Sequence, residues 1–244
     1  MRILALDTAT ELCSAALLLD GRLLQREQRL ERGHAAAILP MVDALLRAAG
    51  VGLRSLDTIA FGRGPGAFTG VRLAASVTQG LAFGAGLPVI PVSDLQALAQ
   101  RFLDESGPAG RVLVCADARM QEVYWACFER SSDGFAHACG DERVGPPADV
   151  RLPARWTSAA PATPGGSPAA LEVAGVGSGF AAYPELRAGL PLGAVRADLL
   201  PRAAEIARLA APEVAARRFI PAEQALPVYL RDDVTQGPGR SSSN

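Results

Sequence analysis

FGRGPGAFTGVRLAASVTQGLAFGAG, residues 61–86, is the stretch that decides the fold of this chain. The apolar segment before it, residues 55–61, predicts a short strand. Three glycines and a proline then predict a loop that can use positive φ angles. Residues 71–83 contain no proline and one glycine, so we expect a helix there with Thr69 as its N-cap. The stretch therefore predicts a strand, a glycine-rich loop and a helix.

The glycine-rich loop has two interpretations, and the residues leave both open. Gly64, Gly66 and Thr69 could present amide groups and a helix N-terminus to an anion such as a phosphate. The loop could equally be a tight turn without a ligand. Asp7 ends the first predicted strand, where a carboxylate could hold a metal-bound phosphate or cap the following hairpin as an Asx turn.

Composition excludes several classes of function. The chain has 244 residues, 49% of them hydrophobic, and its formal net charge of −1 gives no long-range attraction for nucleic acid. All 24 basic residues are arginine, which excludes Schiff-base chemistry and the lysine of a phosphate-binding P-loop. His34 and His137 lie far apart and form no zinc-binding motif. We therefore expect no metal site and no catalytic residue of these kinds.

Cysteine usage and the N-terminus indicate a reducing compartment. Cys13, Cys115, Cys127 and Cys139 occur singly, which is typical of buried free thiols. The sequence opens directly on a strand without a signal peptide, and no apolar run is long enough to span a bilayer. We expect a cytoplasmic protein with no membrane segment.

Two features of the first half of the chain recur in the second half. The strand ending in Asp117 repeats the opening strand ending in Asp7, and the glycines around Gly177 repeat those around Gly64. The two offsets, 110 and 113 residues, are nearly equal. A duplicated domain accounts for both.

The duplication predicts the domain organisation. We expect a first subdomain over residues 1–106 and a second, degenerate one over residues 107–234. Residues 159–170, AAPATPGGSPAA, predict a flexible loop, and residues 235–244 a disordered tail.

Three stretches carry a resemblance to a known family. ILALDTATELCSAAL at residues 3–17, the central FGRGPGAFTGVRLAASVTQGLAFG at residues 61–84 and DARMQEVYWACFE at residues 117–129 resemble the bacterial TsaB (YeaZ) family, and PVYLR at residues 227–231 fits it. More broadly, the duplicated unit resembles the superfamily of actin, sugar kinases and the Hsp70 ATPase. The resemblance implies an α/β fold of two mixed sheets flanked by helices, the duplicated actin-like or ribonuclease H-like fold.

The family resemblance also implies a function. It implies a non-catalytic subunit of the complex that makes threonylcarbamoyladenosine next to the tRNA anticodon. The chain would bind a TsaD-type catalytic paralogue and a TsaE-type ATPase, form a homodimer when alone, and meet tRNA only through the complex. Members of the family pair through their two N-terminal helices. The expected contact residues are the apolar side chains of those helices: Ile38, Leu39, Val42, Leu45, Leu46, Val71, Leu73, Ala74, Val77 and Leu81.

The superfamily resemblance leaves a second function open. A self-sufficient ATP-dependent phosphotransferase would use Asp7 for a metal and the residues from Gly64 to Thr69 for phosphate. Gly177 and Gly179 could then approach an adenosine closely. Bulky residues after Asp117 and the lack of a glycine after Asp7 reduce this interpretation to weak binding of ATP or ADP.

Overall fold

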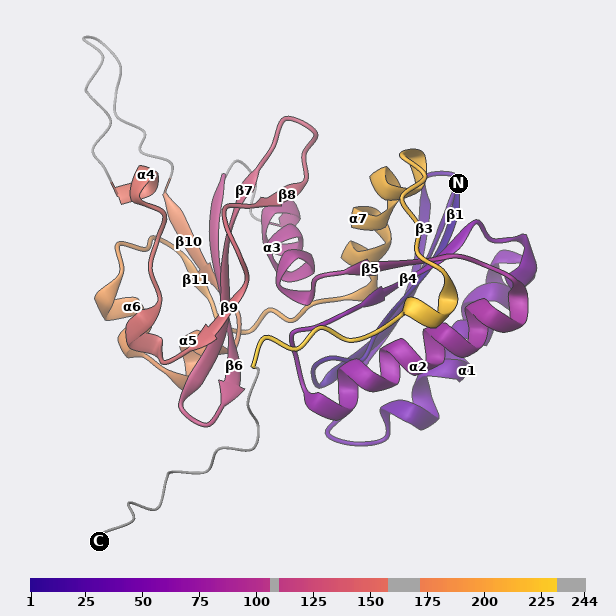
Figure 1. Ribbon diagram of the computed structural model, residues 1–244, viewed down its shortest axis with the longest axis horizontal. Coiled ribbons are helices and arrows are strands. Elements are labelled where there is room, and N and C mark those ends of the chain that lie inside the picture. Colours follow the sequence, from indigo (N-terminus) through magenta and orange to yellow (C-terminus); the bar gives the residue numbers. More distant parts are fainter. Residues whose placement is uncertain (106–109, 158–171, 232–244) are drawn as a thin grey trace, which may run out of the picture.

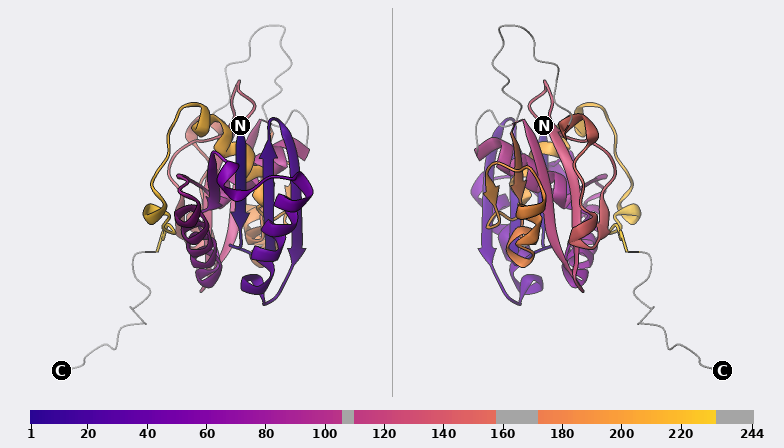
Figure 2. Two further views of the ribbon diagram at one scale, coloured as in Figure 1. Left: turned by 90° about the vertical axis from the view of Figure 1, so that its right-hand side faces the viewer. Right: turned by 90° about the vertical axis from the view of Figure 1, so that its left-hand side faces the viewer.

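The computed structural model describes residues 1–105, 110–157 and 172–231. Two mixed β-sheets lie in opposite halves of the molecule, with helices α3 (Asp94–Glu105) and α7 (Ala203–Ala215) between them (Figure 1). Seen from its two ends, the molecule presents one sheet face-on in each view (Figure 2).

The first sheet has five strands in the order β3-β2-β1-β4-β5. β1, β2 and β3 are antiparallel neighbours, while β4 and β5 run parallel to β1. The strands are β1 (Arg2–Asp7), β2 (Leu12–Leu19), β3 (Arg22–Arg29), β4 (Thr58–Gly62) and β5 (Val89–Val92). β4 begins three residues later than the predicted strand, because a 3-10 turn occupies Leu53–Ser55.

Both faces of the first sheet are apolar because residues of β1 alternate between two cores. Leu4 and Leu6 face α1 (His34–Ala49) and α2 (Phe68–Ala85), whereas Ile3 and Ala5 face α7. Gly50 caps the C-terminus of α1 and Gly86 that of α2, each in the left-handed region that stops a helix. The two expected helices are therefore confirmed.

The second sheet repeats the first. Its order is β11-β10-β6-β7-β8, with β9 also paired to β7. β6 and β7 are antiparallel, and β10 and β11 run parallel to β6. The strands are β6 (Arg111–Arg119), β7 (Glu122–Arg130), β8 (Ala136–Ala138), β9 (Arg143–Gly145), β10 (Val173–Val176) and β11 (Val195–Arg196). Both halves thus share the strand order 3-2-1-4-5, which confirms the duplicated actin-like, ribonuclease H-like fold.

Helices also cover both faces of the second sheet. α3 packs on the face that carries Val112 and Val114, and three short helices pack on the face that carries Leu113. The short helices are α4 (Ala154–Thr157), α5 (Gly179–Ala182) and α6 (Glu185–Gly189), and 3-10 turns occupy Pro147–Asp149 and Ala222–Gln224. The layers therefore alternate as helices, sheet, helices, sheet, helices.

The predicted subdomain boundary needs a correction. Residues 107–234 were expected to form the second half, yet α7 packs on the first sheet through Ala203, Ile206 and Ala210. The apolar stripe of this helix requires burial, but it does not specify which of the two sheets the helix packs on. The predicted loop at residues 159–170 and tail at residues 235–244 lie outside the described residues.

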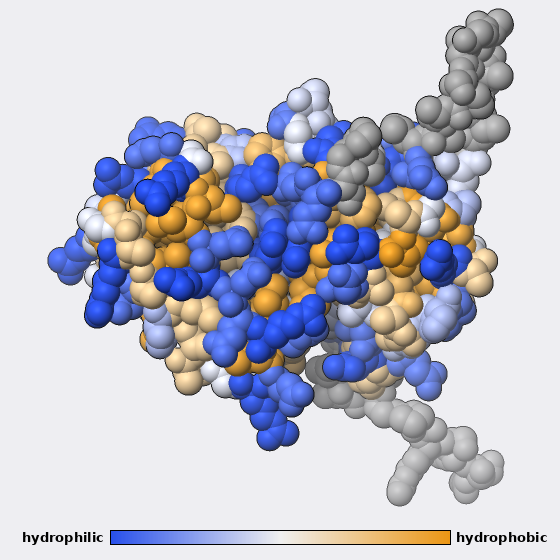
Figure 3. Space-filling model, turned by 180° about the vertical axis from the view of Figure 1, so that it is seen from behind, coloured by the Kyte–Doolittle hydropathy of each residue, from blue (hydrophilic) through white to orange (hydrophobic). Residues whose placement is uncertain are grey.

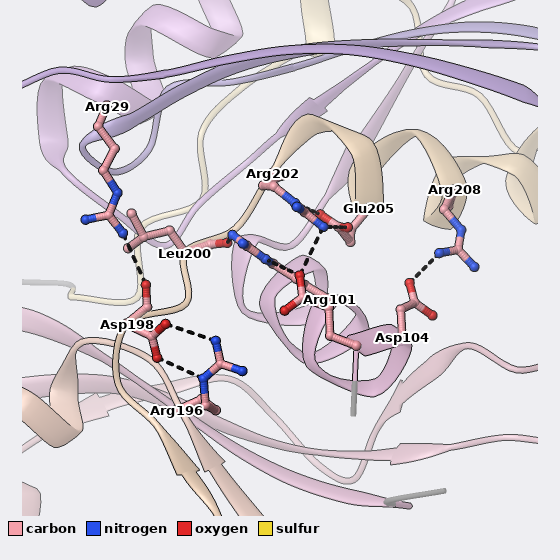
Figure 4. Close-up of polar contacts among 10 residues, drawn as sticks. Arg29, Arg101, Asp104, Arg196, Asp198, Leu200, Arg202, Glu205 and Arg208 are labelled. Carbon is pink, nitrogen blue, oxygen red and sulfur yellow. Dashed lines mark hydrogen bonds and ion pairs between the residues drawn. The ribbon is translucent and has the colours of Figure 1, made fainter. Parts of the chain in front are cut away.

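A polar network joins the two halves on either side of the segment that leads into α7 (Figure 4). Arg29 of β3 donates to the Asp198 carbonyl oxygen at 3.2 Å. Arg202 contacts Glu205 at 2.6 Å and Glu105 of α3 at 3.4 Å, and all three side chains are at least half buried. Hydrophilic residues also predominate along the middle of the back face (Figure 3).

Candidate functional site

The glycine-rich loop packs directly on the hairpin between β1 and β2. Ala67 N donates to the Ala9 carbonyl oxygen at 2.8 Å, and Thr8 Oγ1 donates to the Gly70 carbonyl oxygen at 2.7 Å. A Cβ on Gly66 would lie 2.7 Å from the Ala9 oxygen, and one on Gly70 would overlap the Thr8 carbonyl. These two glycines are therefore needed for close backbone packing.

Two buried carboxyl groups, those of Asp7 and Asp94, accept hydrogen bonds from the backbone of the hairpin and the loop. Gly64 N donates to Asp94 Oδ2 at 2.5 Å, and Ala9 N donates to Asp7 Oδ1 at 2.8 Å. Both carboxyl groups are almost fully buried, and their side chains hydrogen-bond to each other. Asp7 thus forms the Asx turn that was one of its two interpretations. The Gly64 amide, which one of the loop's two interpretations assigned to an anion, donates to the chain's own Asp94 carboxyl group.

Burial changes the protonation of this pair. Desolvation raises the pKa of Asp7 from 3.8 to about 6, although the Ala9 amide opposes the shift. Desolvation, and then the charge of Asp7, raise the pKa of Asp94 well above its ordinary value. Two like charges in one dry site are unfavourable, so at neutral pH Asp94 keeps its proton beside an ionised Asp7.

The second half repeats this arrangement without a second carboxyl group. Asp117 Oδ1 accepts from Arg119 N at 2.8 Å, another Asx turn, and Asp117 N donates to Ser178 Oγ at 3.0 Å. A Cβ on Gly177 or Gly179 would lie 2.5 or 2.9 Å from the Cys115 carbonyl oxygen. The two glycines allow this part of the chain to pack against β6.

The predicted phosphate-loop residues therefore separate into two groups. Asp7, Gly64 and Gly66 come together at the first hairpin, whereas Gly177 and Gly179 pack on the other sheet. Thr69 was expected as the N-cap of α2, but the cap is Ala67, and the exposed Thr69 is the second residue of the helix. The loop therefore ends two residues earlier than predicted, because Ala67 N donates to the Ala9 carbonyl oxygen of the hairpin.

The predicted contact residues on α1 and α2 also separate into two groups, and half of them need a correction. Five are buried in the core beneath the helices and cannot contact a partner: Ile38, Val42, Leu45, Val71 and Ala74. The other five keep part of their surface exposed: Leu39, Leu46, Leu73, Val77 and Leu81. Phe83, which was not in the predicted set, is 79% exposed at the end of α2.

Sequence reasoning missed a cluster at the start of α2. The Arg72 guanidinium lies 3.3 Å from the centre of the exposed Phe68 ring and donates from Nε to Tyr229 Oη at 2.7 Å. Two residues later Arg231 binds Glu122 of β7. The C-terminal extended segment thus contacts both halves, and its PVYLR sequence was the signal available for it.

Asp94 was also missed as a site residue. It is the first residue of α3, where Gln96 N donates to the Ser93 hydroxyl at 3.2 Å. Within residues 1–105, 110–157 and 172–231, no three His, Cys, Asp or Glu side chains lie close enough to hold a metal ion. None of the helices described is long and apolar enough to cross a membrane.

The fold and the buried loop define a class: a duplicated actin-like protein whose first glycine loop binds an internal carboxyl group. The model of the family described as "TsaD: tRNA N6-adenosine threonylcarbamoyltransferase" matches residues 28–226. The chain is 41% identical to tRNA threonylcarbamoyladenosine biosynthesis protein TsaB of Escherichia coli K12, over 96% of both chains. It is 40% identical to the TsaB protein of Haemophilus influenzae, over 98% of both.

Solved structures agree with these relatives. YeaZ from Pseudomonas aeruginosa is 46% identical, with a TM-score of 0.81 over 94% of this chain and 99% of that one. A second Pseudomonas aeruginosa structure, titled as similar to peptidase YEAZ, gives a TM-score of 0.83 at 47% identity and the same coverage. The chain belongs to the TsaB (YeaZ) family of tRNA threonylcarbamoyladenosine biosynthesis proteins.

Proposed function

We propose that this chain is a non-catalytic subunit of a cytoplasmic tRNA threonylcarbamoyladenosine biosynthesis complex. It binds and supports a TsaD-type threonylcarbamoyltransferase through the outer surface of α1 and α2. The observation that carries the proposal is the set of large apolar side chains left on this surface, led by Leu39 (48% exposed) and Phe83. The proposed complex also contains a TsaE-type ATPase, and tRNA meets this chain only within it.

The interior of the chain supports a non-catalytic role. Asp94 takes the Gly64 amide that a phosphate would need, and the Ala9 carbonyl fills the space above Gly66. The two histidines serve the fold locally: His34 contacts the Thr10 carbonyl oxygen, and His137 contacts Asp133. For the competing phosphotransferase function, the Gly64 amide would first have to leave Asp94, and the Ala9 carbonyl would have to move away from Gly66.

Reconstitution tests the proposed function directly. tRNA threonylcarbamoylation is measured with the adenylate-forming synthase, the TsaD-type partner and the ATPase, with and without this chain. We expect product only when the chain is present, and none from the chain alone. Equal product in both reactions would refute the role, and ATP turnover by the isolated chain would favour the phosphotransferase.

Surface variants test the proposed contact face. Leu39→Asp and Phe83→Asp should weaken binding to the TsaD-type partner at least tenfold without unfolding the chain, because a charge would be buried only in the complex. Met120→Asp is the matched control, since Met120 is 74% exposed on the other half. Leu45→Asp should unfold the isolated chain, because Leu45 is 2% exposed. Isothermal titration calorimetry measures binding to the partner, and circular dichroism shows whether each variant is folded. Unaltered binding by both Leu39→Asp and Phe83→Asp would refute the proposed contact surface on α1 and α2.

A further inference from the structure

Two cysteines face each other across the strands β7 and β8. The register pairs Phe128 with Ala138, so the next pair outward is Cys127 and Cys139. Cys139 N donates to the Cys127 carbonyl oxygen at 2.8 Å, which extends the ladder to this pair. The sequence, with eleven residues between the two cysteines, gave no sign of this pairing.

The geometry of the pair suits a disulfide. Opposite residues in a hydrogen-bonded antiparallel pair have Cα atoms about 5.5 Å apart. Disulfides join Cα atoms separated by about 4.4–6.8 Å. Cys127 and Cys139 also pack against the same outer face of the second sheet, so both thiols lie on one side. Both thiols are free.

The two thiols differ in access and in neighbours. Cys127 is buried, with 5% of its surface exposed, whereas Cys139 is partly exposed just beyond β8. Arg155 Nη2 of α4 lies 3.0 Å from Cys139 Sγ, where it can stabilise a thiolate, and Glu129 Oε2 lies 3.7 Å from the same sulfur. An accessible thiol beside a cation, with a buried thiol opposite, is the arrangement of an attacking and a resolving cysteine.

We propose that Cys139 and Cys127 form a redox modification site that hydrogen peroxide converts into a reversible intrachain disulfide. The Cys139 thiolate attacks one peroxide oxygen: the S–O bond forms, the O–O bond breaks, and hydroxide leaves to take up a proton as water. The Cys127 sulfur then attacks the Cys139 sulfenic acid, so that the S–S bond forms, the S–O bond breaks and a second water leaves. Two thiols are oxidised and one peroxide is reduced. A small dithiol reverses the reaction by exchange.

The surroundings set the speed of this reaction. Burial and the Glu129 carboxylate raise the pKa of Cys139, whereas Arg155 opposes the shift. Burial and the Cys139 charge raise the pKa of Cys127 to about 12. Arg111 also binds Glu129, at 3.1 Å, and reduces its effect on the thiol. The disulfide should therefore form slowly at neutral pH and about tenfold faster per pH unit, since the thiolate is the nucleophile.

The other cysteines provide internal controls. Cys13 lies in the first sheet, far from any of the others in the fold. Cys115 lies on β6 on the same face as Cys127, and burial and then the charge of Cys127 raise the pKa of Cys115, but the residue directly opposite Cys127 is Leu113. Both are fully buried and should stay reduced.

Peptide mapping of the full chain tests the proposal. Because the chain has no lysine, trypsin cuts only after arginine and separates all four cysteines: Cys127 in residues 120–130, Cys139 in 131–143, Cys115 in 112–119 and Cys13 in 3–22. The folded protein is treated with hydrogen peroxide at two pH values, its remaining thiols are alkylated, and the peptides are analysed without reductant. We expect peptide 120–130 joined to 131–143 with the loss of two hydrogens, and its disappearance after dithiothreitol.

Two variants and two contrary results complete the test. Cys127→Ala should leave a Cys139 sulfenic acid that dimedone traps, and Arg155→Ala should slow disulfide formation severalfold at pH 7 with circular dichroism unchanged. Oxidation of Cys139 to sulfinic acid in the unaltered chain, with no joined peptide, would overturn the proposal. A joined product of peptides 112–119 and 120–130 would overturn it too, because Cys115 would then be the partner.

Discussion

Replacing Asp7 by asparagine should change how the free energy of unfolding depends on pH. Asp7 is fully buried beside Asp94, and its pKa is raised from 3.8 to about 6. The folded chain therefore holds this proton more tightly than the unfolded chain does. The resulting stabilisation is complete below the unfolded value and is lost as the pH rises through the folded value.

The size of the effect follows from the shift. At 1.36 kcal/mol per pKa unit, a rise from 3.8 to about 6 corresponds to about 3 kcal/mol of stability lost between pH 4 and pH 7. Asparagine resembles the neutral acid: its oxygen can accept from Ala9 N, and its amide can donate to Asp94. The variant does not titrate at this position, so its stability relative to the unaltered protein should rise by about 3 kcal/mol over the same pH range.

Urea denaturation at several pH values between 4 and 7, followed by circular dichroism, measures this difference. Other carboxyl groups act in the opposite sense: Arg196 lowers the pKa of Asp198 to about 2. The readout is therefore the variant minus the unaltered protein at each pH. Asp43→Asn is the matched control, because Asp43 is an exposed partner of Arg47, and its difference should stay below about 1 kcal/mol. A flat difference for Asp7→Asn would refute a titrating buried pair.

Two further substitutions test the packing of the loop and the network between the halves. Gly70→Ala should destabilise the chain by about 1–3 kcal/mol because the new Cβ would overlap a backbone carbonyl. Gly80→Ala, in open space on the same helix, should stabilise the chain by about 0.5–1 kcal/mol. Equal shifts in the urea midpoint of the two variants would contradict this contrast. Arg202→Ala should lower the free energy of unfolding by about 3–5 kcal/mol, because Glu205 would be left buried without its partner. Arg47→Ala, at an exposed ion pair, should lower it by at most about 1 kcal/mol. Similar losses from both arginine variants would show that burial of Glu205 is not decisive.

The sequence predicted the elements of the fold because their signals are local. The expected helix at residues 71–83 lies within α2, and the nearly equal offsets of the repeated strand and glycine loop predicted two sheets of one topology. Which of the two sheets α7 packs on was not predictable from such local signals. Its apolar stripe required burial, but the first and second sheets offer equally apolar faces, and only the path of the chain decides between them.

The site was harder to predict than the fold, for two physical reasons. Asp94 lies 87 residues from Asp7, and a helix-capping position gives no sign of a partner so far along the chain. An apolar stripe on α1 likewise does not distinguish the chain's own core from a partner's surface. Leu45 and Leu39 both belong to that stripe, yet one is 2% exposed and the other 48%.

The duplication explains why the outer surface, rather than the loops, is the place to look for function. In both halves the strand-ending aspartate survives as an Asx turn, at Asp7 and at Asp117. In both halves protein atoms fill the space that the loop glycines leave: the Ala9 carbonyl in one, the Cys115 carbonyl in the other. In the described residues of both halves, the chain's own carbonyl groups thus lie against the loop glycines, where a ligand of this fold would approach. The Ala67 and Gly70 contacts that close the first loop also position the start of α2, the helix whose outer surface carries the proposed partner contacts.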